Sequence, residues 1–257
     1  MSSFNYQTDY ELLAPFNYKT SEFKSIKLPA ELHDASITGE FDIISKCLSE
    51  CHENQDSIIV ETIRRVITNC IFDTVGVIDS IITTFHFDIN SHRDTLIEKC
   101  LETSRTDVLQ YFIDANLDIH NDIKILNNQT PTSVLRVACK LAPSIVSIIL
   151  KNGVDPNSEN GAAFLYVVRG SKRDLIKIFI EFGVDVTTQN NLALFYAVQR
   201  FDFETIKLLI NAGAQINDIP KTVSETTSER INTKIKYLVD IGIDPLDIVK
   251  MWASIKN

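Results

Sequence analysis

The sequence predicts an all-α protein built from about seven stacked helix–turn–helix repeats. The main observation is a recurring phrase, in which a short apolar helix is followed by a tight turn and then by an acidic or amide residue. Four copies of this phrase end at Asp155, Asp185, Gln215 and Asp244, with spacings of 30, 30 and 29 residues. A fixed period of this length is typical of stacked helical units rather than of one globular core.

The last residue of each phrase is an anchor that aligns the repeats along the chain. Extending the alignment toward the N-terminus predicts a repeat array over residues 29–244. The seven anchors of this array are Glu53, Asp88, Asp118, Asp155, Asp185, Gln215 and Asp244.

The position two residues before each anchor predicts how the second helix of a repeat ends. A helix that stops and reverses places this residue in the left-handed region, where Gly is least strained and Asn comes next. His is also enriched there among the other residues. Cys51 in the first repeat departs from this pattern. The remaining repeats supply the predicted turn residues, which are His86, Asn116, Gly153, Gly183, Gly213 and Gly242.

Each repeat is predicted to contain an inner helix followed by an outer helix. The positions six and five residues before the anchor, such as Phe112 and Ile113, indicate the buried stripe of the outer helix. The position 18 residues before the anchor holds small or modest residues, from Ala35 to Thr226, where neighbouring helices approach closely. The position 21 residues before the anchor is apolar throughout and predicts the buried side of the inner helix: Leu32, Ile67, Ile97, Val134, Phe164, Leu194 and Val223.

The first repeat follows the opening of a known repeat signature, with Leu32-His33-Asp34-Ala35, then Gly39 and Phe41-Asp42-Ile43-Ile44. Later repeats keep the Gly-x-Asp ending. On these residues the chain resembles the ankyrin repeat family over roughly residues 30–250, and it is similar to the divergent ankyrin arrays encoded by large DNA viruses of amoebae. The resemblance implies helical hairpins with shortened loops. For His33 it implies hydrogen bonding between neighbouring loops.

Three segments lie outside the regular pattern. Residues 1–28 carry six aromatic residues among polar ones, and they predict either a cap on the first repeat or an arm that binds a partner. Residues 119–129 contain the insertion that stretches one spacing to 37 residues, and an enlarged loop of this kind is suited to specificity. Residues 245–257 begin with Pro245, contain Trp252 and predict a capping helix at the C-terminal end.

Composition indicates a protein of the cytoplasm or nucleus. The cell in question can be an infected host cell. The net charge is −9 and the basic residues are dispersed, which argues against a nucleic-acid surface. No apolar stretch is long enough for a membrane span, and the N-terminus lacks the features of a secretory signal. Five cysteines without a framework spacing suit a reducing compartment.

No pattern in the sequence points to catalysis or to a cofactor. The common phosphate-binding, zinc-protease and serine-hydrolase motifs are missing from the sequence. Cys47, Cys51 and His52 form the only Cys/His cluster, and a structural zinc site needs a second ligand pair. Cys47, Cys70 and Cys100 fall in columns that predict burial. We therefore expect neither enzymatic activity nor a bound metal.

The predicted function is that of a monomeric protein-interaction module, whose partner contacts the hairpin loops and the inner helices. Tyr166, Phe195 and Tyr196 lie on predicted inner helices and have either a partner-binding or a core role. Two alternatives stay open. The first is an adaptor for a ubiquitin ligase, because the opening of an F-box resembles the stretch Leu28-Pro29-Ala30-Glu31-Leu32. The second is a structural array without a dedicated partner, with which the sequence is also compatible. The residues expected at the loop tips, facing a partner, are His92, Arg93, His120, Ile123, Lys124, Asn157, Glu159, Gln189, Asn190 and Asn217.

Overall fold

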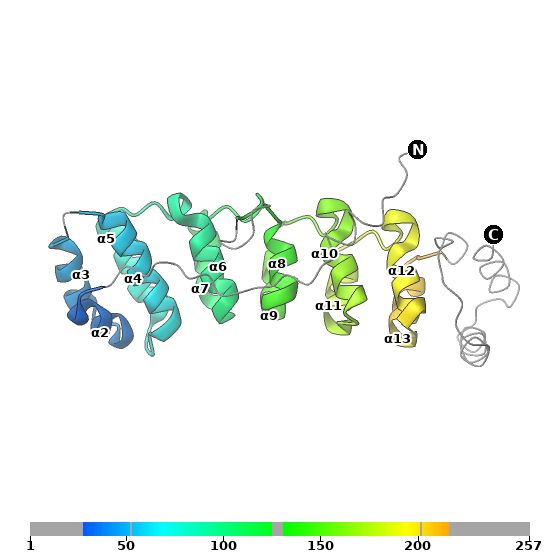
Figure 1. Cartoon of the computed structure of the whole chain (residues 1–257), viewed down its shortest axis with the longest axis horizontal. Helices are drawn as coiled ribbons and strands as arrows, with labels where there is room; N and C mark the ends of the chain where they lie inside the picture. Colours follow the sequence, from blue (N-terminus) through cyan, green and yellow to red (C-terminus); the bar gives the residue numbers. More distant parts are fainter. Residues whose placement is uncertain (1–27, 52, 125–130, 201, 216–257) are drawn as a thin grey trace, which may run out of the picture. The chain divides into compact units, whose positions relative to one another are not determined.

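The computed structural model describes residues 28–51, 53–124, 131–200 and 202–215, which Figure 1 draws as coloured ribbon. The chain divides into two compact units. Among the described residues, 28–154 belong to the first unit and 155–215 to the second. The predicted seventh repeat, residues 1–27 and residues 245–257 lie outside the described residues, so the predicted roles of these segments stay predictions.

The described residues of the first unit form four helical hairpins in chain order. They are α2 (Ala30–Thr38) with α3 (Phe41–Ser49), α4 (Gln55–Asn69) with α5 (Thr74–Phe85), α6 (Arg93–Thr103) with α7 (Thr106–Asp114), and α8 (Val134–Leu141) with α9 (Pro143–Lys151). A short 3-10 helix, η1 (Ile89–His92), leads directly into α6.

Local sequence fixes where several of these helices begin. The Asp73 carboxylate accepts a hydrogen bond from the Gly76 backbone at 3.1 Å and caps α5. The Ser133 hydroxyl accepts one from the Arg136 backbone at 3.3 Å and caps α8. Pro143 starts α9, where its missing N–H costs no hydrogen bond.

The described part of the second unit holds two further hairpins, α10 (Ser158–Arg169) with α11 (Arg173–Glu181) and α12 (Thr188–Arg200) with α13 (Phe203–Asn211). Asp202 caps α13 by accepting hydrogen bonds from the Thr205 backbone and hydroxyl, at 3.3 Å and 2.8 Å. In this unit α10 packs on α12, and α11 packs on α13.

The first unit stacks in the same way, with one row of inner helices and one row of outer helices (Figure 1). The inner helices pack as α2 on α4, α4 on α6 and α6 on α8, while the outer helices pack as α3 on α5, α5 on α7 and α7 on α9. The described residues contain no named strand, only one isolated bridge between Ile123 and Thr132. The predicted all-α repeat fold is confirmed.

The predicted inner-helix core is confirmed wherever the structure describes it. Leu32, Ile67, Ile97, Val134, Phe164 and Leu194 are at most 1% exposed. The column of smaller residues is buried as well, except for Cys70, which is half-buried. The prediction for Cys70 is wrong because α4 has already ended there, and the backbone turns into an extended conformation.

The outer-helix stripe is only partly as predicted. Phe112, Ile149, Phe179 and Leu209 are fully buried, six residues before their anchors. One position later, Thr83 is exposed and Ile113, Ile180 and Ile210 are half-buried. A helix turns by about 100° per residue, so the core-facing neighbours of the first column lie three residues earlier. Those neighbours, Leu109, Val146, Ile176 and Ile206, are buried.

The predicted turns are confirmed at every described repeat that carries them. His86, Asn116, Gly153, Gly183 and Gly213 have positive φ angles, from 50° to 104°. At each turn the residue after the left-handed one donates its backbone N–H to a carbonyl five residues earlier, as Val184 does to Phe179 at 3.0 Å. This bond satisfies a helix-end carbonyl and fixes the reversal of the chain. Gly242 lies outside the described residues.

Replacing Gly183 or Gly213 with alanine should lower the free energy of unfolding by about 1 kcal/mol, because an L side chain is strained at positive φ. The φ angles are 78° and 104°, and a Cβ atom at either position would meet nothing within 4 Å. Backbone strain is therefore the only cost. Chemical denaturation followed by helical circular dichroism measures the change. Gly183→Asn, which tolerates the left-handed region, should lose less, and equal midpoints for all variants would contradict the assignment.

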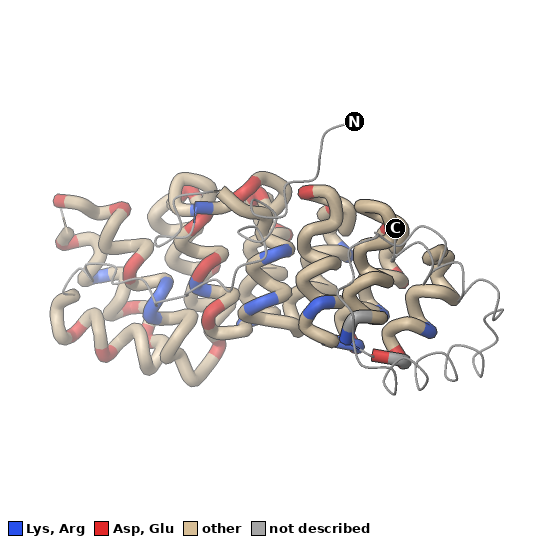
Figure 2. The backbone as a smooth tube through the Cα atoms, turned by 45° about the vertical axis from the view of Figure 1, so that its right-hand side comes forward, with Lys and Arg blue, Asp and Glu red and all other residues tan. Residues whose placement is uncertain are grey.

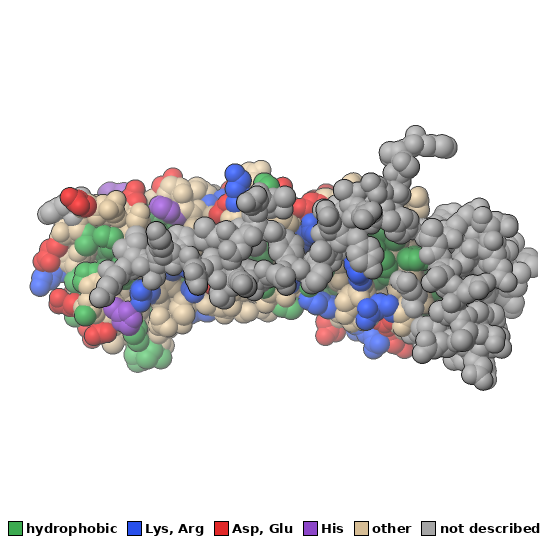
Figure 3. Space-filling view, in the orientation of Figure 1, with side chains coloured by type: hydrophobic (Ala, Val, Ile, Leu, Met, Phe, Trp, Pro, Cys, Tyr) green, Lys and Arg blue, Asp and Glu red, His purple; other side chains and the backbone are tan. Residues whose placement is uncertain are grey.

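Where Figure 3 shows the described residues, hydrophobic side chains lie in groups among polar and charged ones. Ile71 and Phe72, in the connection between α4 and α5, are the large hydrophobic residues with the greatest exposure among the described residues, at 73% and 69%. No described helix is long and apolar enough to cross a membrane.

Candidate interaction surface

The anchor acids shape the hairpin loops that connect one repeat to the next. In four loops the anchor carboxylate accepts a hydrogen bond from the backbone N–H two residues later, at 2.8–2.9 Å. A short acidic side chain is well suited to this turn because it replaces a backbone acceptor. This explains why the sequence pattern ends on Asp. The four pairs are Asp88 with Asn90, Asp118 with His120, Asp155 with Asn157, and Asp185 with Thr187.

Asparagine side chains tie one loop to the next within each unit. In the first unit, Asn90 donates to the Asn116 carbonyl and accepts from the Asp118 backbone, both at 3.1 Å. In the second unit, the Asn157 side chain accepts from the Asp185 backbone at 2.7 Å. Asn90 was not a candidate in the sequence analysis, although its position two residues after an anchor, shared with Asn157, is a signal that could have found it.

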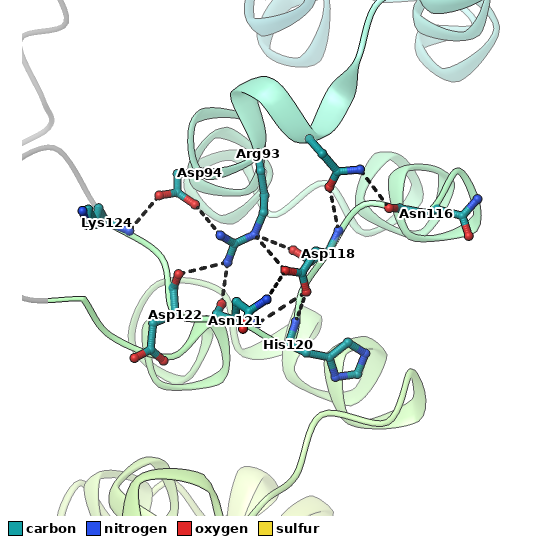
Figure 4. Close-up of polar contacts among 9 residues, drawn as sticks. Arg93, Asp94, Asn116, Asp118, His120, Asn121, Asp122 and Lys124 are labelled. Carbon is teal, nitrogen blue, oxygen red and sulfur yellow. Dashed lines mark hydrogen bonds and ion pairs between the residues drawn. The ribbon is translucent and has the colours of Figure 1, made fainter.

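Arg93 is the centre of the polar network in the first unit (Figure 4). Its guanidinium donates to the backbone carbonyls of Asp118 (2.6 Å), Asn121 and Asp122 (3.1 Å). It also forms an ion pair with Asp94 at 3.0 Å, and its side chain is only 16% exposed. Arg93 thus holds the following loop in place.

Asp118 is held in its charged form by this network. Burial raises the pKa of the carboxyl group, but hydrogen bonds from the Asn121 side chain and from the backbone of His120 and Asn121 outweigh it. The nearby charge of Arg93 acts in the same direction, so the pKa of Asp118 lies below its ordinary value. The carboxylate is therefore ionised at neutral pH and keeps both its turn and its contacts.

The predicted insertion loop folds back on itself where it is described. Ile123 and Thr132 exchange two backbone hydrogen bonds of 2.9 Å and 3.1 Å, and the Lys124 backbone donates to Asp94 at 2.9 Å. Ile123 is completely buried, so the expectation that its side chain lies at a loop tip is wrong. An apolar side chain there fills the base of the loop. Residues 125–130 lie outside the described residues.

The loops of the second unit contain left-handed turns that the sequence analysis did not predict. Glu159, Asn160 and Gly161 have φ angles of 51°, 54° and 74° before the right-handed part of α10, and the equivalent residues at the start of α12 repeat the pattern. Gln189 and Thr188 both donate to the Asn160 carbonyl, at 3.0 Å and 3.3 Å. These bonds hold the two turns against each other and offset part of their strain.

The predicted loop-tip residues fall into two groups. Arg93, Asn157 and Gln189 use their side chains to hold neighbouring loops, and His92 stacks on Phe87 with ring centroids 5.5 Å apart. Exposed positions are taken by His120, Lys124, Glu159 and Asn190. Asn217 lies outside the described residues.

The inner helices of the second unit bring tyrosines and cations together. Tyr166 on α10 and Tyr196 on α12 are both half-buried, and they are 30 residues apart in the sequence. The Lys172 ammonium lies 5.0 Å from the centre of the Tyr166 ring, and the Arg169 guanidinium lies 6.0 Å from the centre of the Tyr196 ring. Phe195, by contrast, is 6% exposed and belongs to the core. We call Tyr166, Arg169, Lys172, Tyr196 and Arg200 the tyrosine–cation surface.

Comparison with known proteins supports the repeat assignment. A profile of ankyrin repeats, in three copies, matches residues 135–219. Over these residues the chain is similar to ankyrin repeats. The structure is similar to the crystal structure of the ankyrin repeat domain of Bcl-3, described as a unique member of the IkappaB protein family, with a TM-score of 0.51 and 14% sequence identity. The match covers 89% of this chain and 99% of the Bcl-3 domain, and at this identity it shows a shared fold. Comparison with curated proteins gives no match.

The ankyrin fold gives the buried residues at the start of the array a structural role. Leu28 and Leu32, the leucines of the F-box-like stretch, are 7% and 0% exposed. Both leucines are therefore buried in this structure, and Leu32 lies on α2 in the first hairpin. Among the described residues, no three His, Cys, Asp or Glu side chains form a group suited to a metal ion.

Proposed function

We propose that this chain is a non-enzymatic module that binds a protein partner through its hairpin loops and inner helices. The observation that carries the proposal is the set of hydrogen bonds through which Asn90, Arg93 and Asn157 hold neighbouring loops together within each unit. Loops that are already ordered lose little conformational entropy when a partner binds. Within each unit, such loops can present exposed side chains in a constant arrangement, among them His120 and Lys124 in the first unit and Asn190 in the second.

The wider setting belongs to the same proposal. The module acts as a monomer inside the cell, in the cytoplasm or nucleus, and the earlier similarity to viral arrays makes an infected host cell one such setting. The dispersed charges in Figure 2, where Lys and Arg alternate with Asp and Glu over the described residues, suit a protein partner better than a nucleic acid. The repeat fold likewise offers an extended binding surface.

Affinity capture with matched surface variants of the full chain tests this proposal. The loop variant carries His120→Ala, Lys124→Ala and Asn190→Gly, all at exposed positions. The control variant carries Lys177→Ala, Glu181→Ala and Lys207→Ala, at exposed positions of the outer helices α11 and α13. Each set lowers the formal charge by one. We expect a partner that the loop variant loses and the control retains. A partner lost only with the control, or no specific partner at all, would refute the proposal.

A further inference from the structure

The connection between α4 and α5 differs from the equivalent connections in the neighbouring repeats. It spans four residues, 70–73, whereas two residues join α2 to α3 and two join α6 to α7. The shorter connections, Gly39-Glu40 and Ser104-Arg105, hold no large apolar residue, but the longer one carries Ile71 and Phe72. An insertion in a single repeat often forms part of a binding face. We call Ile71 and Phe72 the apolar pair.

The apolar pair is unusually exposed for large hydrophobic side chains. Ile71 is 73% exposed and Phe72 is 69% exposed, although Thr74 close by is buried. In Figure 3 a group of hydrophobic side chains projects at the lower left edge of the surface, where Figure 1 places the lower ends of α4 and α5. Exposed apolar side chains that lie together mark an interaction site more often than scattered single ones do.

Hydrogen bonds on both sides order this connection. The Ile71 backbone N–H donates to the Ile37 carbonyl at 3.4 Å, which ties the connection to α2. The Cys70 thiol donates to the Phe72 carbonyl at 2.9 Å, and Asp73 caps α5. An ordered connection keeps the apolar pair in one place and loses little conformational entropy when a partner covers it.

The surroundings of the apolar pair are acidic. The third hairpin reaches this end of α4, since the Arg105 guanidinium donates to the Ile67 carbonyl at 3.2 Å. Arg105 is the only Lys or Arg in residues 37–43, 68–75 and 103–108, and it is already paired with the carboxylate two residues later at 2.7 Å. The remaining charged residues of these three stretches are acids at exposed positions, which are Glu40, Asp42 and Asp73.

We propose that the apolar pair binds in an apolar pocket of a protein partner, and that Lys or Arg side chains line the rim of this pocket. Phe72 fills the pocket as an aromatic anchor, with Ile71 beside it. The basic rim faces Glu40 and Asp73, and this charge complementarity orients the partner. A second copy of this chain fits less well, because the same acids would face one another. A membrane also fits less well, since the cytoplasmic leaflet is negatively charged.

The inference goes beyond the proposed function. Each inner helix runs from a hairpin loop to the connection that follows it, so the apolar pair lies at the opposite end of α4 from the hairpin loops. Neither proposal depends on the other, and the loop variant described above leaves the apolar pair intact.

Fluorescence anisotropy of the full chain tests the apolar part of the proposal. The probe is a short fluorescein-labelled helical peptide, whose leucine face and lysine border stand in for the pocket and its rim. The test variant carries Ile71→Ser and Phe72→Ser. Its control carries Ile71→Leu and Phe72→Leu, which keeps both positions apolar. Because both side chains are exposed, neither variant should change the denaturation midpoint.

We expect the serine variant to lose about tenfold or more in affinity, because the aromatic anchor is gone, and the leucine variant to lose less than about threefold. The same peptide with serine in place of leucine should bind far more weakly. If the serine variant bound the peptide as tightly as the unchanged protein, or if the unchanged protein did not bind it, the proposal would be wrong.

A second pair of variants tests the charge complementarity. The test variant carries Glu40→Gln and Asp73→Asn, because asparagine also caps a helix. Its control carries Glu181→Gln and Glu204→Gln, at exposed positions of α11 and α13. We expect a loss of about threefold or more in the test variant at low salt, and of less than about twofold in the control. Equal losses would indicate bulk attraction and would contradict the basic rim.

Two further measurements distinguish a protein pocket from other occupants of the apolar pair. A concentration-dependent dimer in sedimentation velocity, abolished by Ile71→Ser with Phe72→Ser, would replace the proposal with a second copy of this chain. Cosedimentation with phosphatidylcholine vesicles, lost in the same variant, would replace it with a membrane. We expect neither result. The proposed function fails separately, in the affinity capture with the loop variant.

Discussion

Replacing Phe179 with alanine should lower the free energy of unfolding by about 4 kcal/mol, which is the largest effect expected among the described residues. Phe179 lies on α11, is 0% exposed and packs against Phe164 with ring centroids 5.7 Å apart. Its loss removes a large apolar side chain from the space between an inner and an outer helix. The cavity that remains adds to the cost because the surrounding helices relax only partly.

Chemical denaturation of the full chain measures this change, and Ile180→Ala is the matched control. Ile180 is the next residue on the same helix but is half-buried, so its truncation should cost roughly half as much or less. A comparable loss at both positions would contradict the assignment of Phe179, rather than Ile180, to the core.

Replacing Arg93 with methionine should cost about 3 kcal/mol, the second largest expected effect. The guanidinium donates to three backbone carbonyls of the following loop, and methionine replaces the apolar part of the side chain but none of the donors. Asp94 would lose its ion-pair partner, whose guanidinium nitrogen lies 3.0 Å from the carboxylate. The loop from Asp118 to Lys124 should also exchange its backbone amides faster, because its anchor is gone.

Chemical denaturation of Arg93→Met measures the expected loss of stability, and hydrogen exchange measures the faster exchange of the loop amides. Lys177→Met is the control, because Lys177 is exposed on an outer helix and its replacement also removes one positive charge. The control should stay within about 0.5 kcal/mol of the unchanged protein. If the loop amides exchanged at the same rate in Arg93→Met as in the unchanged protein, the network of Figure 4 would not be what holds the loop.

Most of the fold could be predicted from the repeat spacing, because residues at equivalent positions of successive repeats share one structural role. The glycine column predicted left-handed turns because a single φ angle restricts the residue that can occupy it. The inner-helix column was equally informative, as every described member is buried. The outer-helix columns were less informative. Side chains of adjacent residues on a helix point about 100° apart around its axis, and the sequence does not distinguish a half-buried isoleucine from a buried one.

The candidate surface was less predictable for a different reason. Arg93, Asn157 and Gln189 were expected to face a partner because polar residues in loops are commonly exposed. In the structure they bind backbone carbonyls and amides of neighbouring loops, at contacts between residues 28 or 29 apart in the sequence. Of these three residues, only Asn157 carries a mark in the sequence, since it shares with Asn90 the position two residues after an anchor. The tyrosine–cation surface also depends on rings and cations from different helices, which only the packed structure brings together.

Photo-crosslinking tests the central claim, partner binding on the inner helices, most directly. Benzoylphenylalanine would replace Tyr196 on α12 in one full-length protein and the exposed Lys207 on α13 in another. After irradiation with cell extract, mass spectrometry would identify the crosslinked peptides. The account predicts a specific crosslink from position 196 to a protein partner, and none to that partner from position 207. A partner crosslinked from position 207 alone would contradict it.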